Sequence, residues 1–236
     1  MGLIIGIEST AHTFSFGAVS RDGSEVLPST SSLDRPEEGG IHPREAADHH
    51  VEYAGELLRN AMAKWEAKKE DIEAIAFSQG PGLGPCLRVG GSVARSMSMA
   101  LAVPLIGVNH CVAHIEIGRR MTGCVDPILL YVSGGNTQVI ARASGRYRVL
   151  GETLDIGIGN MLDKFGRSIG IPFPGGPEIE RKASGFIQKN GFNHLLELPY
   201  AVHGTDMAFS GILGAAISHA ERGEDHGLVC HSLQEV

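Results

Sequence analysis

The chain has 236 residues, 42% of them hydrophobic and 20% charged, a composition typical of a soluble globular protein with one large or two modest domains. Its apolar runs are too short to cross a membrane and no cleavable leader follows Met1, so we expect no membrane association and a cytoplasmic location. The net charge of −7 argues against a protein that grips nucleic acid by itself, and the four cysteines show neither a zinc-knuckle nor a disulfide spacing.

The first half of the chain predicts three strands followed by alternating helices and strands. β-prone apolar runs, helical spacing of apolar residues, and Gly and Pro breakers define these elements. They are, in order, strands 3–7, 13–19 and 25–29, a helix from 41 to 65, a strand 72–78, a rigid loop 80–85, a helix 89–101, a strand 104–108 and a helix capped by Asn109. The order βββαβαβα predicts a mixed sheet with helices on both faces.

The second half opens in the same way as the first. Strands are expected at 128–133, 138–142 and 147–150, and helices at 156–169, from 178, after Gly211 and at 228–236. This internal echo indicates two similar lobes, an N-terminal lobe of residues 1–124 and a C-terminal lobe of residues 125–236. The second lobe has too few elements to repeat all of the first, so we expect it to be incomplete.

Two histidines, His110 and His114, lie four residues apart at the start of a predicted helix. This spacing puts both side chains on one helical face, which suits two ligands of one metal ion. With 11 histidines in the chain, the spacing also arises by chance, and two surface or capping histidines explain it equally well. The spacing alone leaves both interpretations open.

Short polar turns join the first two strands of each half. Backbone amides in such turns can bind phosphate, and small side chains allow its close approach. The turn at Ser133, Gly134, Gly135 and Thr137 is the better candidate, and the partner turn at 8–12 offers Glu8, Ser9 and His12 as possible cleft residues. Plain hairpin turns would have the same local sequence.

A further glycine pair precedes the helix predicted from Glu178. The helix start after Gly175 and Gly176 favours a bound anion, and Glu180 could hold a ribose hydroxyl, although a tight turn between helices would look the same. Tyr131 enters the Ser133 turn from its strand and could bring a phenol oxygen to a cleft or serve only in packing.

Seven motifs in order, spread over essentially the whole chain, resemble the universal tRNA threonylcarbamoyladenosine synthase family. This family comprises TsaD of bacteria and the catalytic subunit of the KEOPS complex in archaea and eukaryotes. The residues of the motifs resemble the archaeal and eukaryotic branch more than the bacterial one. The motifs are Gly6-Ile-Glu-Ser-Thr10, Gly40-Ile-His-Pro-Arg-Glu45, Gln79-Gly-Pro-Gly-Leu-Gly84, Asn109-His-Cys-Val-Ala-His114, Tyr131-Val-Ser-Gly-Gly-Asn-Thr137, Pro174-Gly-Gly-Pro177 and Phe209-Ser-Gly211.

The resemblance implies a fold, a reaction and partners. The fold is the two-lobed α/β fold of the actin/Hsp70/sugar-kinase (ASKHA) type. The reaction moves a threonylcarbamoyl group from threonylcarbamoyl-adenylate to N6 of the adenosine beside the anticodon in tRNAs that read ANN codons, and it releases AMP. The partners are tRNA and KEOPS-type subunits, among them a kinase-like ATPase and a small dimerising subunit.

The resemblance also implies site residues. His110, His114 and Tyr131 would hold one divalent metal, with iron favoured and zinc possible. The adenylate would be held by Tyr131, Val132, Ser133, Gly134, Gly135, Asp163, Gly176 and Glu180. Family members continue past the match at 232–235, and their continuation carries an Asp metal ligand and an Asn that contacts the nucleotide. Gly214 also stands where the family leads us to expect a threonine.

Two other functions remain as alternatives. One is a non-catalytic nucleotide-binding scaffold that keeps the phosphate-binding turns without the chemistry. The other is a metallopeptidase, an activity once suggested for this family by its histidine pair. The peptidase is the weaker alternative, because Cys111 stands where the Glu of a His-Glu-x-x-His motif would act as general base.

Overall fold

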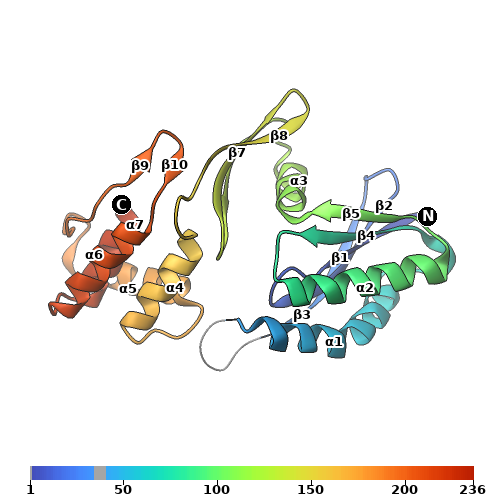
Figure 1. Cartoon of the computed structure of the whole chain (residues 1–236), viewed down its shortest axis with the longest axis horizontal. Helices are drawn as coiled ribbons and strands as arrows, with labels where there is room; N and C mark the ends of the chain where they lie inside the picture. Colours follow the sequence, from blue (N-terminus) through green and yellow to red (C-terminus); the bar gives the residue numbers. More distant parts are fainter. Residues whose placement is uncertain (1, 35–40) are drawn as a thin grey trace. The chain divides into compact units, whose positions relative to one another are not determined.

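The computed structural model describes residues 2–34 and 41–236, and the chain forms two compact units, Met1–Thr122 and Gly123–Val236 (Figure 1). The boundary predicted from the sequence stood between residues 124 and 125. Gly40 of the second motif lies outside the described residues.

The first unit is built on a mixed five-stranded sheet. Its strand order is β3-β2-β1-β4-β5, in which β1, β2 and β3 are antiparallel and β4 and β5 run parallel to β1. This is the βββαβαβα order predicted from the sequence. The elements are β1 (Leu3–Glu8), β2 (Thr13–Ser20), β3 (Val26–Leu33), α1 (Pro43–Lys64), a 3-10 helix (Lys69–Asp71), β4 (Ile72–Gly80), α2 (Gly84–Leu101), β5 (Leu105–Asn109) and α3 (His110–Thr122).

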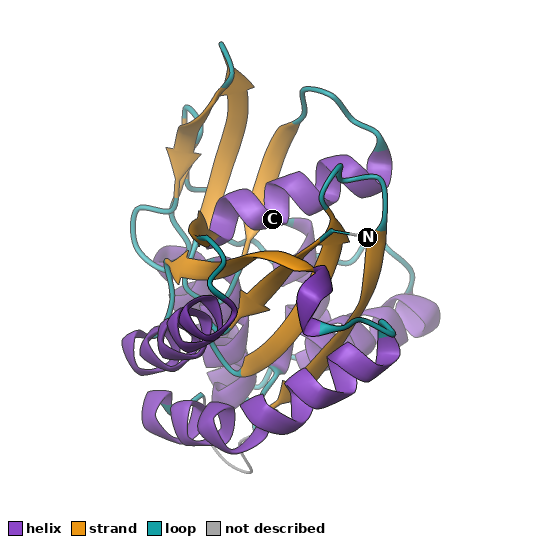
Figure 2. Cartoon of the chain, turned by 90° about the vertical axis from the view of Figure 1, so that its right-hand side faces the viewer, coloured by secondary structure: helices purple, strands orange, loops and turns teal. Residues whose placement is uncertain are grey.

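The core of the first unit lies between the sheet and the long helices α1 and α2. Alternate residues of β1 and β2 point into it, among them Ile5, Phe14 and Phe16, which are fully buried. The period of two that marks a half-buried strand therefore selects this face. Figure 1 shows α1 and α2 on one side of the strands of this unit and α3 on the other, and Figure 2 shows the chain turned by 90°.

The second unit opens on an antiparallel three-stranded sheet of order β6-β7-β8. Its helices form a separate core, in which Phe165, Ile179 and Val229 are almost fully buried. The elements are β6 (Ile128–Val132), β7 (Thr137–Ala143), β8 (Arg146–Glu152), α4 (Ile158–Ser168), α5 (Gly175–Asn190), β9 (Val202–His203), β10 (Asp206–Met207), α6 (Ser210–Glu221) and α7 (His226–Glu235).

Several helices begin at other residues than the sequence predicted. Helix α2 starts at Gly84 instead of Val89. Pro85 fits the first turn of this helix, because the N–H groups of a first turn have no acceptor within the helix and the N–H that proline lacks is therefore not needed. Helix α5 starts at Gly175 instead of Glu178, so its two glycines form the first turn and do not precede it. The short hairpin of β9 and β10 was not predicted, since two-residue strands leave no periodic pattern.

Two α/β units that each open on antiparallel strands confirm the expected α/β class and the division into two units. In the described parts of the chain, no helix combines the length and apolar character that crossing a membrane requires.

Candidate functional site

The two histidines of α3 face each other at the start of the helix. Asn109 accepts a hydrogen bond from the Val112 N–H at 3.2 Å, as expected of an N-cap side chain. One helical turn apart, the Nε2 atoms of His110 and His114 are 3.2 Å from each other and the two rings meet edge to face. The two Nε2 atoms thus lie within hydrogen-bond distance of each other, and the ring tautomers decide which of them donates.

This geometry fits two ligands of a single metal ion. Two imidazole nitrogens bound tetrahedrally at about 2.1 Å from one zinc ion lie roughly 3.4 Å apart, close to the separation of the two Nε2 atoms. Within residues 2–34 and 41–236, no group of three or more His, Cys, Asp or Glu side chains could hold a metal. The first unit therefore offers two such ligands, and Tyr131 belongs to the other unit.

Glu8, at the end of β1, contacts the outer edge of the His110 ring. Its Oε2 lies 3.2 Å from His110 Nδ1 and accepts a hydrogen bond from Ser78 Oγ on β4. Its Oε1 accepts bonds from the backbone N–H and the hydroxyl of Thr10, at 2.7 and 2.5 Å. The carboxylate is therefore held from both sides, by the turn that follows its own strand and by the neighbouring parallel strand.

The same contacts set the charge of Glu8. Burial raises the pKa of this carboxyl, but hydrogen bonds from His110, Ser78 and Thr10 outweigh it and lower the pKa from 4.5 to about 2. Burial together with the nearby His110 lowers the pKa of His114, although Glu8 acts in the opposite direction. At neutral pH the site therefore combines an ionised carboxylate with a neutral His114, the form of imidazole that binds metals.

The other predicted cleft residues of this turn, Ser9 and His12, are buried or partly buried. Ser9 is almost fully buried beneath α2, where a Cβ added to Gly90 would lie 1.9 Å from Ser9 Oγ. Thr10 O accepts the Leu83 N–H at 2.7 Å, which joins the turn to the start of α2. His12 is partly buried, burial lowers its pKa against the opposing charge of Asp34, and its Nδ1 has no hydrogen-bond partner among the described residues.

The second turn, between β6 and β7, is closed by its own hydrogen bonds and by α4. Ser133 N–H donates to Asn136 O at 2.8 Å, and the Asn136 N–H donates to Ser133 Oγ at 3.0 Å. The first amides of α4 then donate to the turn, Gly159 to Ser133 O and Asn160 to Gly134 O. The N–H groups that a helix start leaves without acceptors are thereby satisfied by the turn itself.

Two glycines before and in α4 make this contact possible. A Cβ at Gly157 would lie 2.5 Å from Gly134 O, and one at Gly159 would lie 2.8 Å from Ser133 O. Sequence reasoning missed both residues, although the Gly-x-Gly spacing at the start of a predicted helix is a recognisable sign of close backbone approach. The amides of Gly134 and Gly135 donate to no acceptor among the described residues, so they are available to an anion.

Neighbouring residues of β6 differ in exposure. Tyr131 is 8% exposed, whereas Val132 is 50% exposed, as expected when successive strand residues face opposite sides of a sheet. The structure thus brings Tyr131 to the Ser133 turn as a buried side chain and puts the adjacent Val132 on the opposite, exposed face.

The remaining predicted residues lie where α4 meets α5. Asp163 Oδ1 accepts the N–H of Gly175 at 2.8 Å, and a Cβ at Gly175 would lie 3.0 Å from Leu162 O. Gly175 therefore allows α5 to start against α4, with Asp163 satisfying one free amide of its first turn. Gly176 and Glu180 are one helical turn apart on α5, and Glu180 is exposed.

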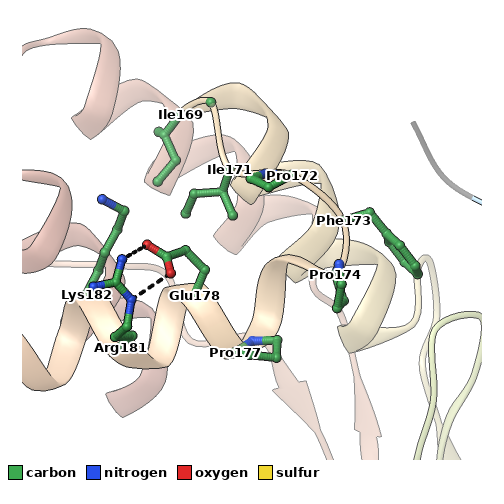
Figure 3. Close-up of a pocket in the computed structure, with 10 residues that line it drawn as sticks. Ile169, Ile171, Pro172, Phe173, Pro174, Pro177, Glu178, Arg181 and Lys182 are labelled. Atoms are coloured by element: carbon green, nitrogen blue, oxygen red, sulfur yellow. Dashed lines mark hydrogen bonds and ion pairs between the residues drawn. The ribbon is translucent and has the colours of Figure 1, made fainter. Parts of the chain in front are cut away.

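A pocket of about 510 Å³ lies beside α5 (Figure 3). The Glu178 carboxylate in its wall pairs with Arg181 through bonds of 2.5 and 2.7 Å. None of the predicted nucleotide-binding residues lines this pocket. Its lining comprises Ile169, Gly170, Ile171, Pro172, Phe173, Pro174, Pro177, Glu178, Arg181 and Lys182.

Comparison with known proteins gives the family. The family model described as TsaD, tRNA N6-adenosine threonylcarbamoyltransferase, matches residues 25–236. The chain belongs to this family. This confirms the resemblance seen in the seven motifs.

Two archaeal relatives illustrate the similarity. A protein of Thermoplasma volcanium, named a probable bifunctional tRNA threonylcarbamoyladenosine biosynthesis protein, is 53% identical over 99% of this chain and 43% of its own length. A tRNA N6-adenosine threonylcarbamoyltransferase of Methanopyrus kandleri is 50% identical over 99% of this chain and 67% of its own length. This TsaD-family chain thus spans less than half the length of the first relative.

A solved structure from Pseudomonas aeruginosa, of an uncharacterized protein with similarity to the peptidase YEAZ, aligns with 96% of this TsaD-family chain and 96% of its own. It does so with a TM-score of 0.47 and 14% identity.

Proposed function

We propose that the protein takes part in tRNA modification as a threonylcarbamoyltransferase. The substrate would be threonylcarbamoyl-adenylate, the acceptor N6 of the adenosine beside the anticodon of tRNAs reading ANN codons, and the leaving group AMP. Family membership over residues 25–236 carries this proposal, and the convergent nitrogens of His110 and His114 agree with it.

The second unit would bind the adenylate. In this proposal the free amides of Gly134 and Gly135 donate to the phosphate, as backbone amides of such turns do for anions. Tyr131, Val132 and Ser133 belong to the same strand and turn, while Asp163, Gly176 and Glu180 stand at the α4 and α5 contact. The exposed Glu180 carboxylate is suited to accept a hydrogen bond from a ribose hydroxyl.

His110 and His114 would hold one divalent metal, and Tyr131 would complete the set from this chain. Iron is favoured and zinc is also suited to imidazole ligands. When bound, the metal supplies Lewis acidity toward a carbonyl oxygen. Because AMP is a good leaving group, the protein's own task is chiefly to orient the adenylate and the adenosine amine and to stabilise the developing charge.

The acidic chain suggests that other subunits help to hold tRNA, since phosphate contacts need clustered Lys and Arg. We therefore include in the proposal a KEOPS-type assembly in the cytoplasm, with a kinase-like ATPase and a small dimerising subunit. Salt-dependent tRNA binding by the assembly but not by this chain alone would support this division of work.

Single-turnover transfer tests the proposal. We expect His110→Ala, in the protein assembled with its partners, to reduce transfer from threonylcarbamoyl-adenylate to tRNA at least a hundredfold. The exposed His203 provides the control, and His203→Ala should transfer normally. Full activity of His110→Ala would refute the metal role, and nucleotide binding without any transfer by the wild type would instead identify a scaffold.

A further inference from the structure

The contact between Glu8 and His110 fixes which ring nitrogen of His110 carries a proton. An ionised carboxylate only accepts hydrogen bonds. Glu8 Oε2 lies 3.2 Å from His110 Nδ1, so Nδ1 is the protonated nitrogen of the neutral ring. Thr10 Oγ1, at 3.4 Å from the same Nδ1, already donates its proton to Glu8 and can only add a second acceptor there.

In the neutral ring the other nitrogen of His110 then carries a lone pair. In a neutral imidazole one nitrogen donates and the other accepts, and the donor here is Nδ1. The remaining nitrogen, Nε2, is the atom that lies 3.2 Å from His114 Nε2. The lone pair therefore points to where the two histidines converge.

The carboxylate is itself fixed in place before any ligand arrives. Thr10 holds Oε1 through its N–H and its hydroxyl, and Ser78 holds Oε2 from the neighbouring strand. Three elements, β1, β4 and α3, thus meet at one partly buried hydrogen-bonded group within the first unit. A ligand whose ring is oriented by such an outer partner needs less reorganisation when it binds a metal.

We propose that Glu8 is the positioning residue that holds His110 in its Nδ1–H tautomer and so presents Nε2 as the ligand atom. The effect on metal affinity rests on the proposed metal role of the histidine pair. The tautomer itself does not, because it is set by contacts within the protein.

Glu8→Gln provides a sharp test because it keeps the shape of the side chain. Thr10 donates to Oε1 through two groups, so the amide oxygen of the glutamine should stay at that position. The amide NH₂ then takes the place of Oε2, where it donates to His110 Nδ1 and accepts nothing. We therefore expect the substitution to reverse the tautomer of His110, with the proton now on Nε2.

Nitrogen-15 NMR of the histidine rings, on the full chain without metal, reads the tautomer directly. We expect Nδ1–H in the wild type and Nε2–H in Glu8→Gln. Calorimetric titration with Zn²⁺ alone should then show about a 10- to 100-fold weaker affinity for Glu8→Gln. The matched control is Glu73→Gln on β4, whose partly exposed carboxylate pairs with Arg21, and it should change neither reading.

Each result of the NMR and Zn²⁺ measurements supports or contradicts the positioning role of Glu8. An unchanged tautomer in Glu8→Gln, or a reversed tautomer with unchanged Zn²⁺ affinity, would overturn the proposal. Failure of the wild type to bind Zn²⁺ would count against the metal role of the pair, while the tautomer would still decide the role of Glu8.

A second variant covers the case in which Glu8→Gln does not fold. Ser78→Ala removes only the hydroxyl that holds Oε2, so His110 should keep Nδ1–H and bind Zn²⁺ several-fold more weakly. Unchanged affinity in Ser78→Ala would contradict the proposed positioning.

Discussion

The turns after β1 and β6 stand at equivalent places in the two units but are built differently. The first turn is organised by side chains, since Glu8 gathers bonds from Thr10, Ser78 and His110. The second is organised by backbone, since Ser133 and Gly134 accept the first amides of α4. A shared strand-turn-strand plan thus supports an oriented histidine in one unit and free backbone amides in the other.

Both turns nevertheless depend on glycines that let a following element approach. Gly82 and Gly90 approach the first turn, and Gly157 and Gly159 approach the second. These glycines differ in what an added Cβ would meet: at Gly90 it would meet the Ser9 side chain, whereas at Gly82 it would meet the backbone and Cβ of Thr10, and at Gly157 only the backbone of the second turn. A side chain shifts more easily than a backbone turn, so Gly157 should tolerate an added Cβ less well than Gly90.

The largest effect is expected for Gly157→Ala. The backbone of Gly157 is extended and open to alanine, so the penalty comes from backbone clashes with Gly134 O at 2.5 Å, Asn136 N at 2.7 Å and Gly135 C at 2.8 Å. We predict a loss of about 3 kcal/mol in the free energy of unfolding, at the upper end for overpacking. Urea denaturation measures it, with Gly185→Ala in α5 as the control, because a Cβ there meets nothing. Equal stability of the two variants would show that α4 does not rest on this turn.

A neighbouring pair of glycines in α2 tests the first turn. Gly90→Ala crowds the buried Ser9 and should lower the free energy of unfolding by about 2 kcal/mol. Gly91→Ala meets only Phe77 at 3.6 Å and should raise it by up to about 1 kcal/mol, as alanine favours helix. The two adjacent variants should therefore differ in sign in thermal unfolding, and the same sign for both would contradict the packing described for Ser9.

Acid should remove the stabilising contribution of Glu8, which organises the turn after β1. The pKa of Glu8 is lowered from 4.5 to about 2, so its contribution to stability is present above pH 4.5 and is lost as the pH falls toward 2. Allowing for its partial exposure, the loss is at most about 2 kcal/mol. Unfolding free energies of wild type and Glu8→Gln, measured from pH 5 to pH 2, should therefore converge. A constant difference across that range would refute this role of the ionised carboxylate.

The smallest predicted effect is a loss of AMP affinity without a loss of stability, caused by a substitution in the second turn. A Cβ at Gly135 meets nothing, so Gly135→Ala should leave thermal unfolding unchanged. It should still weaken AMP binding about tenfold if the Gly134 and Gly135 amides contact phosphate, because hydrogen bonds to a charged group are then disturbed. Gly214→Ala in α6, equally open, is the control for calorimetry. Unaltered AMP affinity in Gly135→Ala would remove this turn from the nucleotide site.

The sequence predicts much of this arrangement where a pattern is local. Alternation marks β1 and β2, and helical spacing together with Asn109 sets the start of α3, which the Val112 bond confirms. The histidine pair was predicted to share a face, and its Nε2 atoms do converge.

What the sequence could not predict depends on contacts between distant residues. Ser78 meets Glu8 across 70 positions, and Asp163 caps the start of α5 from α4, so neither role leaves a local pattern. Glu8 was expected only as a possible cleft residue, because its contact with His110 requires the parallel pairing of β1, β4 and β5. The assignment of Tyr131 to the metal and of Glu180 to the nucleotide stays a prediction.

Calorimetric titration of each variant with both ligands tests most directly the claim that the first turn supports metal binding and the second binds phosphate. Wild type, Glu8→Gln and Gly135→Ala would each be titrated with Zn²⁺ alone and with AMP alone. We predict that Glu8→Gln loses Zn²⁺ affinity and keeps AMP affinity, and that Gly135→Ala does the reverse. If each variant weakened both ligands equally, or neither ligand, the division between a side-chain turn for metal and a backbone turn for phosphate would be wrong.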